Sequence, residues 1–353
     1  MSDSRTRRLI LTCVAGLTAL LVVIIAGKSA FGKRAGQEAE THPVPVNLNE
    51  TLKNEMSDTS SLAGFDKMVQ NYLTYWGIHG ASISVMRNDS LLFAKGYGEA
   101  DSGKKMEPGN ILRMASVSKL VTAVGIMVLQ ERGLLNLKDH VFGPDGILND
   151  STYNAAIKDT LYYRITVEDL LRHKGGFSKR GGDPMFSTRW IMMQNGWSEV
   201  PSQERLMEVQ LKRRLKFVPG SAQEYSNFGY LALSMVIEKV SGMDYETFIQ
   251  ENVLRPVGCV DFHIAGNYYK HKFPNETRYY VQHDDEPAEE FNNSGRKVTR
   301  CYGGNNVTGL SGAGAWAAST PELALFVASI DGSPEVPDII SRESVDLMTE
   351  YFE

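Results

Sequence analysis

Residues 113–123 read RMASVSKLVTA and open an apolar segment that extends to Arg132. Apolar side chains recur in it every three or four positions, which is the spacing of one face of a helix. These side chains are Leu120, Val121, Val124, Met127, Val128 and Leu129. We therefore predict a buried helix over residues 114–132 that Gly133 ends. Ser116 and Lys119 stand three residues apart at its start, so a helix would place both on one face.

The Ser116–Lys119 pair has the chemistry of a nucleophile and its base. A serine hydroxyl is a weak nucleophile until a base removes its proton, and a lysine can be that base when burial lowers its pKa. The S-x-x-K spacing is weak evidence by itself, because two other copies occur. They are Ser102/Lys105 and Ser294/Lys297. Both lie in polar, glycine-containing segments, so we select Ser116 and Lys119 as the candidate nucleophile and base.

A second candidate element is Tyr225-Ser226-Asn227, the only Y-x-N in the chain. It follows a Pro219-Gly220 turn and precedes another apolar segment. A tyrosine hydroxyl can relay a proton, and an asparagine amide can orient a carbonyl or a lysine. Taken alone, the motif fits better with a packed tyrosine ring and an asparagine that caps the next helix.

Elsewhere the residue patterns predict an α+β fold, with a two-stranded start and a mostly helical interior. Residues 81–97 read as a β-hairpin turning at Asn88-Asp89. Four further segments read as helices. They are a segment capped by Thr166 and stopped at Gly175-Gly176, residues 229–240, residues 245–254, and a segment capped by Thr320. Residues 265–308 read as a long surface excursion with an acidic patch at 284–290.

The charge distribution argues against nucleic acid as a partner. The net charge is -5, but residues 1–34 carry +5 and the remainder, with 31 basic and 41 acidic residues, carries -10. An acidic body lacks the basic footprint that phosphate backbones require. The three cysteines form no C-x-x-C pair, and the seven histidines lack ligand spacing. We therefore expect no metal and no other cofactor.

Residues 9–27 form an uncharged, mostly apolar run of 19 residues preceded by Arg5, Arg7 and Arg8. As a helix this run would span about 28 Å, close to the hydrocarbon thickness of a bilayer. It is long for the apolar region of a signal peptide, and the cleavage sites near it are poor. We favour a single transmembrane anchor, with secretion after signal cleavage as the alternative.

The expected organisation is a cytoplasmic stub and anchor (or signal peptide) over residues 1–34, a linker over 35–60 and a hydrolase domain over 61–353. An anchor so close to the chain start usually leaves the body outside the cytoplasm, on the periplasmic or extracellular side. There Cys259 and Cys301 could form a disulfide; two free buried thiols are the equal alternative.

Four blocks in order carry a resemblance to a known family. They are RMASVSKLVTA (113–123), LLRHKGGF (170–177), FVPGSAQEYSNFGYLALS (217–234) and SGAGAWAASTPELALF (311–326). From about Gly80 onward the chain resembles the serine β-lactamase-related proteins, in the branch of class C β-lactamases, DD-peptidases and esterases. The resemblance implies a β-lactamase/transpeptidase-like fold, an antiparallel sheet flanked by a mostly helical region.

For this sequence the resemblance implies Ser116 as nucleophile, Lys119 as base, Tyr225 as proton relay and Asn227 as substrate contact. It implies an acyl-enzyme mechanism on an amide or ester bond: a D-Ala-D-Ala peptide, a β-lactam or a small ester. His173 matches the block in which a histidine closes a helix end and organises a loop. Ser118, two residues after Ser116, is not selected as the nucleophile.

One departure from the family pattern is the missing third motif. After Asn227 no Lys or His is followed by Thr-Gly or Ser-Gly, and Val307-Thr308-Gly309 lacks the cation. In the family, the segment with this motif supplies strands of the central sheet and one donor of the oxyanion hole. We therefore expect a C-terminally incomplete domain with doubtful turnover. A catalytically impaired, penicillin-binding-like binding or structural protein is the alternative.

Overall fold

The computed structural model describes residues 47–179, 182–281, 286–333 and 338–350. The chain divides into two units, Met1–Val44 and Pro45–Glu353, and the fold described below belongs to the second. Among the described residues no helix is both long enough and apolar enough to cross a membrane. The predicted anchor, residues 9–27, lies outside the described residues.

The predicted hairpin is confirmed as strands β1 (Gly80–Arg87) and β2 (Ser90–Asp101), paired antiparallel with Arg87 opposite Ser90. Asn88 and Asp89 form the two-residue turn with φ of 48° and 54°. Two successive positive φ values match the twist of the flanking strands, and asparagine and aspartate tolerate them. Strand β3 (Lys104–Lys105) extends the sheet beyond β2.

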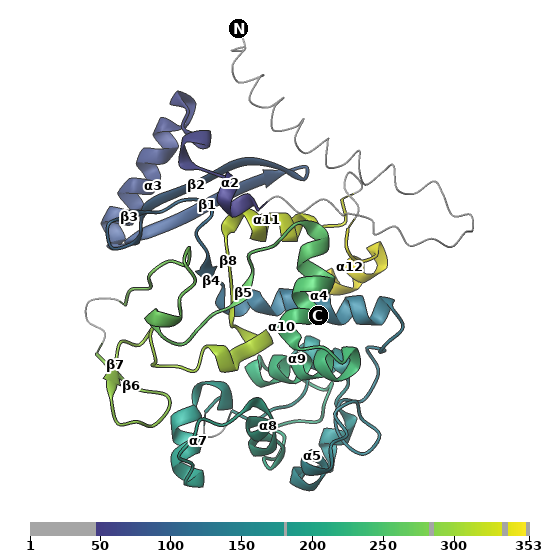
Figure 1. Ribbon diagram of the computed structural model, residues 1–353. Coiled ribbons are helices and arrows are strands. Elements are labelled where there is room, and N and C mark those ends of the chain that lie inside the picture. Colours follow the sequence, from purple (N-terminus) through teal and green to yellow (C-terminus); the bar gives the residue numbers. More distant parts are fainter. Residues whose placement is uncertain (1–46, 180–181, 282–285, 334–337, 351–353) are drawn as a thin grey trace, which may run out of the picture. The chain divides into compact units, whose positions relative to one another are not determined.

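Helices pack on this hairpin (Figure 1). Helix α3 (Ala63–Trp76) contributes to a small core, whose buried members are Val69, Leu73, Phe93 and Tyr97. Helix α11 (Thr320–Ala328) packs on β1. The prediction that Thr320 caps this helix is wrong by one residue, because the side chain of Ser319 accepts from the Glu322 amide. The Thr320 hydroxyl instead lies 2.8 Å from both Ser82 and Ser84 hydroxyls on β1.

A second small sheet brings three distant segments together beside the candidate nucleophile. Strand β8 (Trp316–Ala318) lies between β4 (Leu112–Arg113) and β5 (His263–Ile264), antiparallel to both. Trp316 is fully buried in it. Strand β4 ends three residues before Ser116, so its pairing with β8 fixes the position from which the chain continues to Ser116.

The main core is helical, as expected from the apolar periodicity. Its centre is α4 (Ser118–Glu131), α9 (Asn227–Ser241) and α10 (Tyr245–Ile249), which continues as a π-helical turn at Gln250–Leu254. Gly125 allows α4 to pack closely against α9 and α10. A Cβ at this position would lie 3.2 Å from Ile237 Cδ1 on α9 and closer still to Ile249 Cδ1 on α10.

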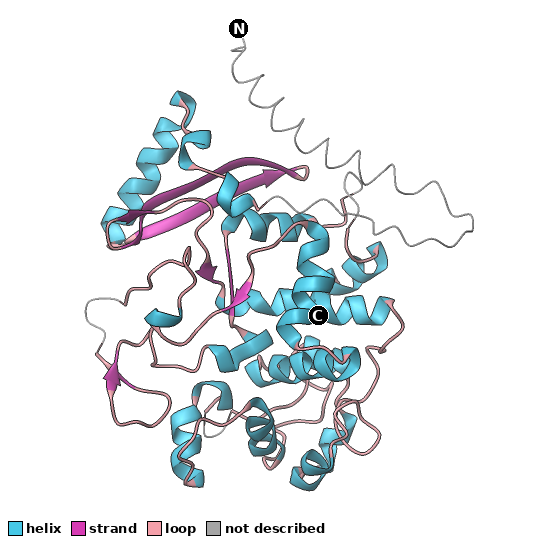
Figure 2. Cartoon of the chain, in the orientation of Figure 1, coloured by secondary structure: helices cyan, strands magenta, loops and turns pink. Residues whose placement is uncertain are grey.

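Helix α6 (Val167–Leu171) carries the predicted Thr166 cap, completed as a capping box by Asp169. It ends before the predicted Gly175-Gly176 stop, because His173 already adopts φ of 58°. Figure 2 shows that helices fill the side of the body away from the hairpin. The remaining α-helices and strands of the described residues are α2 (Leu48–Thr51), α5 (Ser151–Ala156), α7 (Thr188–Asn195), α8 (Gln203–Leu211), α12 (Arg342–Thr349), β6 (Ala288–Glu289) and β7 (Lys297–Val298).

Two segments expected to be peripheral pack into the body. Within the expected linker, Asn49 of α2 is buried and donates to Asp261 at 2.7 Å. Within residues 265–308, Glu276 and Glu290 are buried, and Glu290 pairs with Arg296 at 2.5 Å. A buried carboxylate needs such partners, so this segment is not the plain surface excursion that its polarity predicted.

The two thiols of the body are not joined to each other. Cys259 is buried and lies 3.2 Å from the Glu322 carbonyl oxygen, whereas Cys301 is half-buried and lies 3.4 Å from the Tyr279 carbonyl oxygen. Their disulfide, one of the two alternatives from the sequence, is not formed in this structure.

Gly96→Ala is expected to lower the free energy of unfolding by about 1–3 kcal/mol, the usual cost of overpacking. Gly96 lies on β2, and a Cβ there would clash with the Met106 carbonyl group and the Glu107 amide, which are backbone atoms that cannot rotate away. Gly64→Ala is the control, because a Cβ at this α3 position meets nothing within 4 Å. Urea denaturation measures both, and equal midpoints for the two variants would contradict the prediction.

Candidate active site

Ser116 lies on a sharp turn between a strand and a helix. The chain leaves β4, passes Ala115 at φ of 47° and enters the 3₁₀ turn Ala115–Val117 that leads into α4. A positive φ at alanine is strained, and such strain clusters at functional sites. The α-helix starts at Ser118, four residues later than predicted, and the turn leaves the Ser116 side chain exposed to solvent.

Lys119 lies one turn further on and is nearly inaccessible, with 7% of its surface exposed. Its Nζ is 3.4 Å from Ser116 Oγ, 2.9 Å from Asn227 Oδ1 and 2.5 Å from the Ala313 carbonyl oxygen. Burial lowers the pKa of Lys119, while Tyr225 and Asp183 act in the opposite direction. Burial acts this way because it disfavours the charged ammonium.

Tyr225 reaches the same point from a segment 109 residues away. Its hydroxyl lies 2.6 Å from Ser116 Oγ, and its ring centre lies 4.8 Å from Lys119 Nζ. The Tyr225 side chain is exposed, so its hydroxyl can meet a ligand that approaches Ser116.

Asn227 is the first residue of α9 and contacts both a lysine and an aspartate side chain. Its Oδ1 accepts from Lys119 Nζ, and its Nδ2 donates to Asp183 Oδ2 at 2.8 Å. The cap of α9 is Ser226, whose hydroxyl accepts from the Gly229 amide at 3.1 Å. The structure thus brings all four predicted residues together and does not use Asn227 as the helix cap.

Two members of this cluster were not predicted from the sequence. Asp183 lies on the loop before α7, and its aspartate-proline pattern indicates only a capped turn. The Ala313 contact uses a main-chain carbonyl, which leaves no trace in residue type.

Neighbouring residues support the cluster. The Ser118 hydroxyl is buried and accepts from the Trp316 amide at 3.1 Å, so it points away from Ser116. His173 Nδ1 accepts from the Ser226 amide at 3.2 Å, and its ring centre lies 4.5 Å from that of Tyr225. Burial lowers the pKa of His173 to about 4, helped by the charges of Lys119 and Lys179. A neutral His173 therefore holds the Tyr225 segment in place, as its sequence block predicted.

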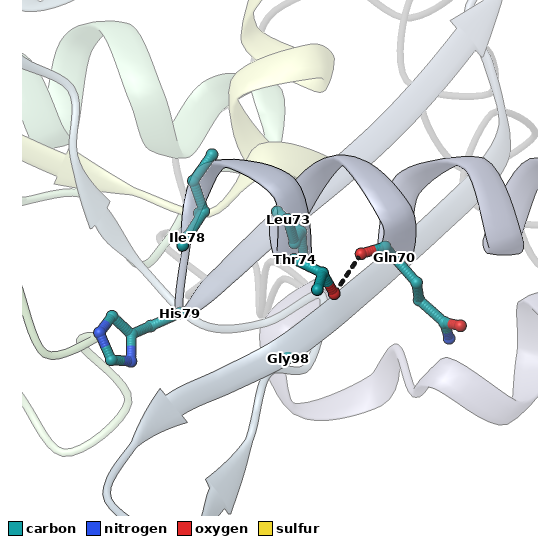
Figure 3. Close-up of a pocket in the computed structure, with 7 residues that line it drawn as sticks. Gln70, Leu73, Thr74, Ile78, His79 and Gly98 are labelled. Carbon is teal, nitrogen blue, oxygen red and sulfur yellow. Dashed lines mark hydrogen bonds between the residues drawn. The ribbon is translucent and has the colours of Figure 1, made fainter.

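The cluster is separate from a cavity of about 380 Å³ that lies at the C-terminal end of α3. Figure 3 shows that cavity's lining, including Leu73, Thr74, Ile78 and His79. In the described part of the chain, no group of three or more His, Cys, Asp or Glu side chains is placed to hold a metal ion.

Comparison with known sequences places the chain in a family. The sequence profile of the family described as Beta-lactamase matches residues 65–350. This chain belongs to the β-lactamase family. The expected β-lactamase/transpeptidase-like fold is thereby confirmed, and the four site residues lie inside the matched region.

Curated relatives of this β-lactamase family protein include Penicillin-binding protein 4* of Bacillus subtilis (strain 168). It is 27% identical over 187 residues, which are 52% of this chain and 34% of that protein. A putative D-alanyl-D-alanine carboxypeptidase of Escherichia coli O157:H7 is 25% identical, over 56% of this chain and 47% of the relative. The chain therefore spans between a third and a half of the length of these relatives.

Solved structures support the fold. The octameric penicillin-binding protein homologue from Pyrococcus abyssi superposes with a TM-score of 0.57 at 23% identity, covering 81% of this chain and 59% of that one. The D-amino acid amidase from Ochrobactrum anthropi SV3, complexed with L-phenylalanine amide, gives 0.58 at 18% identity, covering 81% and 74%. These superpositions support the β-lactamase/transpeptidase-like fold of this chain.

Proposed function

We propose that this protein is a serine hydrolase that works through an acyl-enzyme, with Ser116 as nucleophile and Lys119 as general base. The observation that carries the proposal is the convergence of Ser116, Lys119 and Tyr225. Their functional atoms lie 2.6 Å and 3.4 Å apart although Tyr225 comes from a distant segment. A nucleophile within reach of a base, with the base itself oriented by a third group, is the signature of nucleophilic catalysis.

The reaction has two halves. Neutral Lys119 takes the Ser116 proton as Oγ attacks the substrate carbonyl carbon, and the Tyr225 hydroxyl delivers a proton to the leaving nitrogen or oxygen as the bond to it breaks. The Lys119 ammonium then returns its proton to the Tyr225 phenolate, which leaves the lysine neutral again. Water attacks the ester carbonyl and gives a proton to Lys119. The acyl–Oγ bond breaks as Lys119 passes that proton to Ser116 Oγ, which releases the acid and restores Ser116 Oγ–H. Asn227 contacts the substrate near Lys119 in this scheme.

Candidate substrates are D-Ala-D-Ala peptides, β-lactams and small amides or esters. The names of a carboxypeptidase relative and an amidase neighbour support this class. The alternative is a catalytically impaired, penicillin-binding-like protein that binds or assembles.

Mass spectrometry of the full chain after mixing with a penicillin and with a p-nitrophenyl ester separates the two functions. A hydrolase forms an acyl adduct on Ser116 that decays while product rises beyond one equivalent per chain. A binding protein stops at one equivalent and retains the adduct. The absence of any adduct would contradict both the hydrolase and a covalent penicillin-binding function, and would leave the assembling protein of the alternative.

We further propose that residues 9–27 tether the domain to a membrane, with the domain on the periplasmic or extracellular side. The run is uncharged and long enough to span the hydrocarbon layer, which supports this proposal. The full chain is expected to stay in the membrane fraction after an alkaline carbonate wash, because only embedded segments resist it. A chain lacking residues 1–34 is expected to be released as an acidic soluble protein. A mature N-terminus near residue 27 or 31 would instead show secretion after signal cleavage.

A further inference from the structure

We propose that Asp183 is a positioning residue for the reaction: it holds the side-chain amide of Asn227 in the one orientation that leaves Lys119 able to act as a base. This inference rests on the proposed hydrolase function and adds to it a residue from outside the family's motifs.

Both oxygens of the Asp183 carboxylate are engaged. Oδ1 accepts from the Met185 amide at 3.0 Å and so caps the 3₁₀ turn Pro184–Phe186, and Oδ2 accepts from Asn227 Nδ2 at 2.8 Å. The first contact fixes the carboxylate relative to its own loop. The second selects the Asn227 orientation, because a carboxylate only accepts hydrogen bonds and therefore requires the NH₂ end of the amide to face it.

The opposite end of the amide, Oδ1, then faces Lys119. A neutral amine has two N–H donors and one lone pair. The two acceptors beside Nζ, Asn227 Oδ1 at 2.9 Å and the Ala313 carbonyl oxygen at 2.5 Å, take both donors. The lone pair is left for the side of Nζ that holds the two hydroxyls, Ser116 Oγ at 3.4 Å and the Tyr225 hydroxyl beside it. This is the arrangement in which Lys119 can receive the serine proton.

A flipped Asn227 amide would reverse the outcome. Its NH₂ group would point at Nζ and donate to the lone pair. Lys119 would then be neutral, but its lone pair could not accept the serine proton. Its two ends differ only in hydrogen-bonding character, so the partner on the far side decides between the orientations. In this structure that partner is Asp183.

The negative charge of Asp183 and the Asn227 orientation that it imposes have opposite effects on the reaction rate, so the two effects can be separated by experiment. The negative charge of Asp183 favours the ammonium form of Lys119, against the effect of burial. The other groups that face Nζ are the Tyr225 hydroxyl, the ring of Tyr230, whose centre lies 5.5 Å away, and the neutral His173. Lys179 Nζ lies further out, 5.8 Å from the Tyr225 ring centre. Removing the charge alone would leave more Lys119 neutral and speed the reaction at neutral pH. Losing the orientation would slow it.

The test compares Asp183→Ser with Asp183→Asn in the full chain. Serine keeps the cap of the 3₁₀ turn, since it is a good N-cap residue, but is too short to reach Asn227. Asparagine has a single oxygen, so with that oxygen turned to Asn227 Nδ2 it keeps the acceptor for Asn227 but not the cap on the Met185 amide. We expect Asp183→Ser to reduce kcat for a p-nitrophenyl ester about 10- to 100-fold with little change in KM, the size expected for lost positioning of a base. We expect Asp183→Asn to stay within a few-fold of the unchanged chain.

A second readout does not depend on turnover. The ¹³Cε resonance of Lys119 reports its titration midpoint, which we expect to fall from the unchanged chain to Asp183→Asn and further to Asp183→Ser. The result that identifies the positioning role is an Asp183→Ser chain in which the Lys119 titration midpoint is lower and kcat is nevertheless reduced. In an Asn227→Ala background the same Asp183→Ser change is expected to cause no further loss of kcat, because no amide is left to orient.

Equal losses of kcat in both variants, or equal midpoints, would overturn the proposal and assign Asp183 to charge or to folding. Unchanged kcat in Asp183→Ser would also overturn it. Failure of the hydrolase function itself is a separate outcome, in which the chain forms no adduct on Ser116. The order of the Lys119 titration midpoints in the three chains would then still support or overturn the role of Asp183.

Discussion

Ser116→Ala is expected to abolish covalent labelling by a fluorescent penicillin or a fluorophosphonate, and to lower kcat by a factor on the order of 10⁴–10⁶. The physical reason is that Ser116 Oγ is the exposed hydroxyl that lies within reach of both Lys119 Nζ and the Tyr225 hydroxyl. Without Oγ no acyl bond can form, and a water in its place is neither positioned nor covalently retained. Gel fluorescence and intact mass measure the adduct.

Ser118→Ala is the matched control, because it removes the same atom two residues away. The Ser118 hydroxyl is buried and accepts from the Trp316 amide, so its loss leaves a buried N–H unpaired. We expect this variant to label normally and to lose about 1–3 kcal/mol of unfolding free energy. Equal labelling of Ser116→Ala and Ser118→Ala would refute the assignment of the nucleophile.

Lys119→Met has the second-largest expected effect. Methionine has a similar length but cannot accept a proton, so kcat is expected to fall about 10²–10⁴-fold, the usual contribution of a general base. It also leaves Asn227 Oδ1 and the Ala313 carbonyl oxygen without their lysine donor, so a loss of stability should accompany the loss of rate. Lys119→Arg should be as slow, because a guanidinium stays protonated.

The pH dependence of the rate separates a base from a merely structural lysine. The active form carries neutral Lys119, so kcat/KM is expected to rise with pH through the Lys119 pKa. Burial holds that pKa below the ordinary value of 10.5. The rising limb should therefore lie below 10.5 in the unchanged chain and be missing in Lys119→Met. Lys179→Met is the control, since its ammonium lies 5.8 Å from the Tyr225 ring centre, and it should keep the limb. A limb that persists in Lys119→Met would assign the base elsewhere.

Local patterns were sufficient for much of the fold. The Asn88-Asp89 hairpin, the Thr166 cap and the helices α4 and α9 follow from spacing and turn chemistry within one short segment. Their ends were less well predicted. The Ala115 φ of 47° delays the start of α4, and the His173 φ of 58° ends α6 early. Both residues are held in strained conformations by long-range contacts, which a local pattern does not contain.

The sequence by itself determined which side chains could do chemistry here: one serine and one lysine spaced for a shared helix face, and one tyrosine and one asparagine before another helix. Only the tertiary structure decided how they meet. It placed the Tyr225 hydroxyl at 2.6 Å from Ser116, supplied the Ala313 carbonyl to Lys119 and set Asp183 against Asn227. The reason is that the side chains sharing one helix face come from residues close together in the sequence, so their spacing can be predicted from it. A main-chain acceptor or a partner on a distant loop is selected by how the β4–β8–β5 sheet and α9 pack together, and no residue type in either segment records that choice.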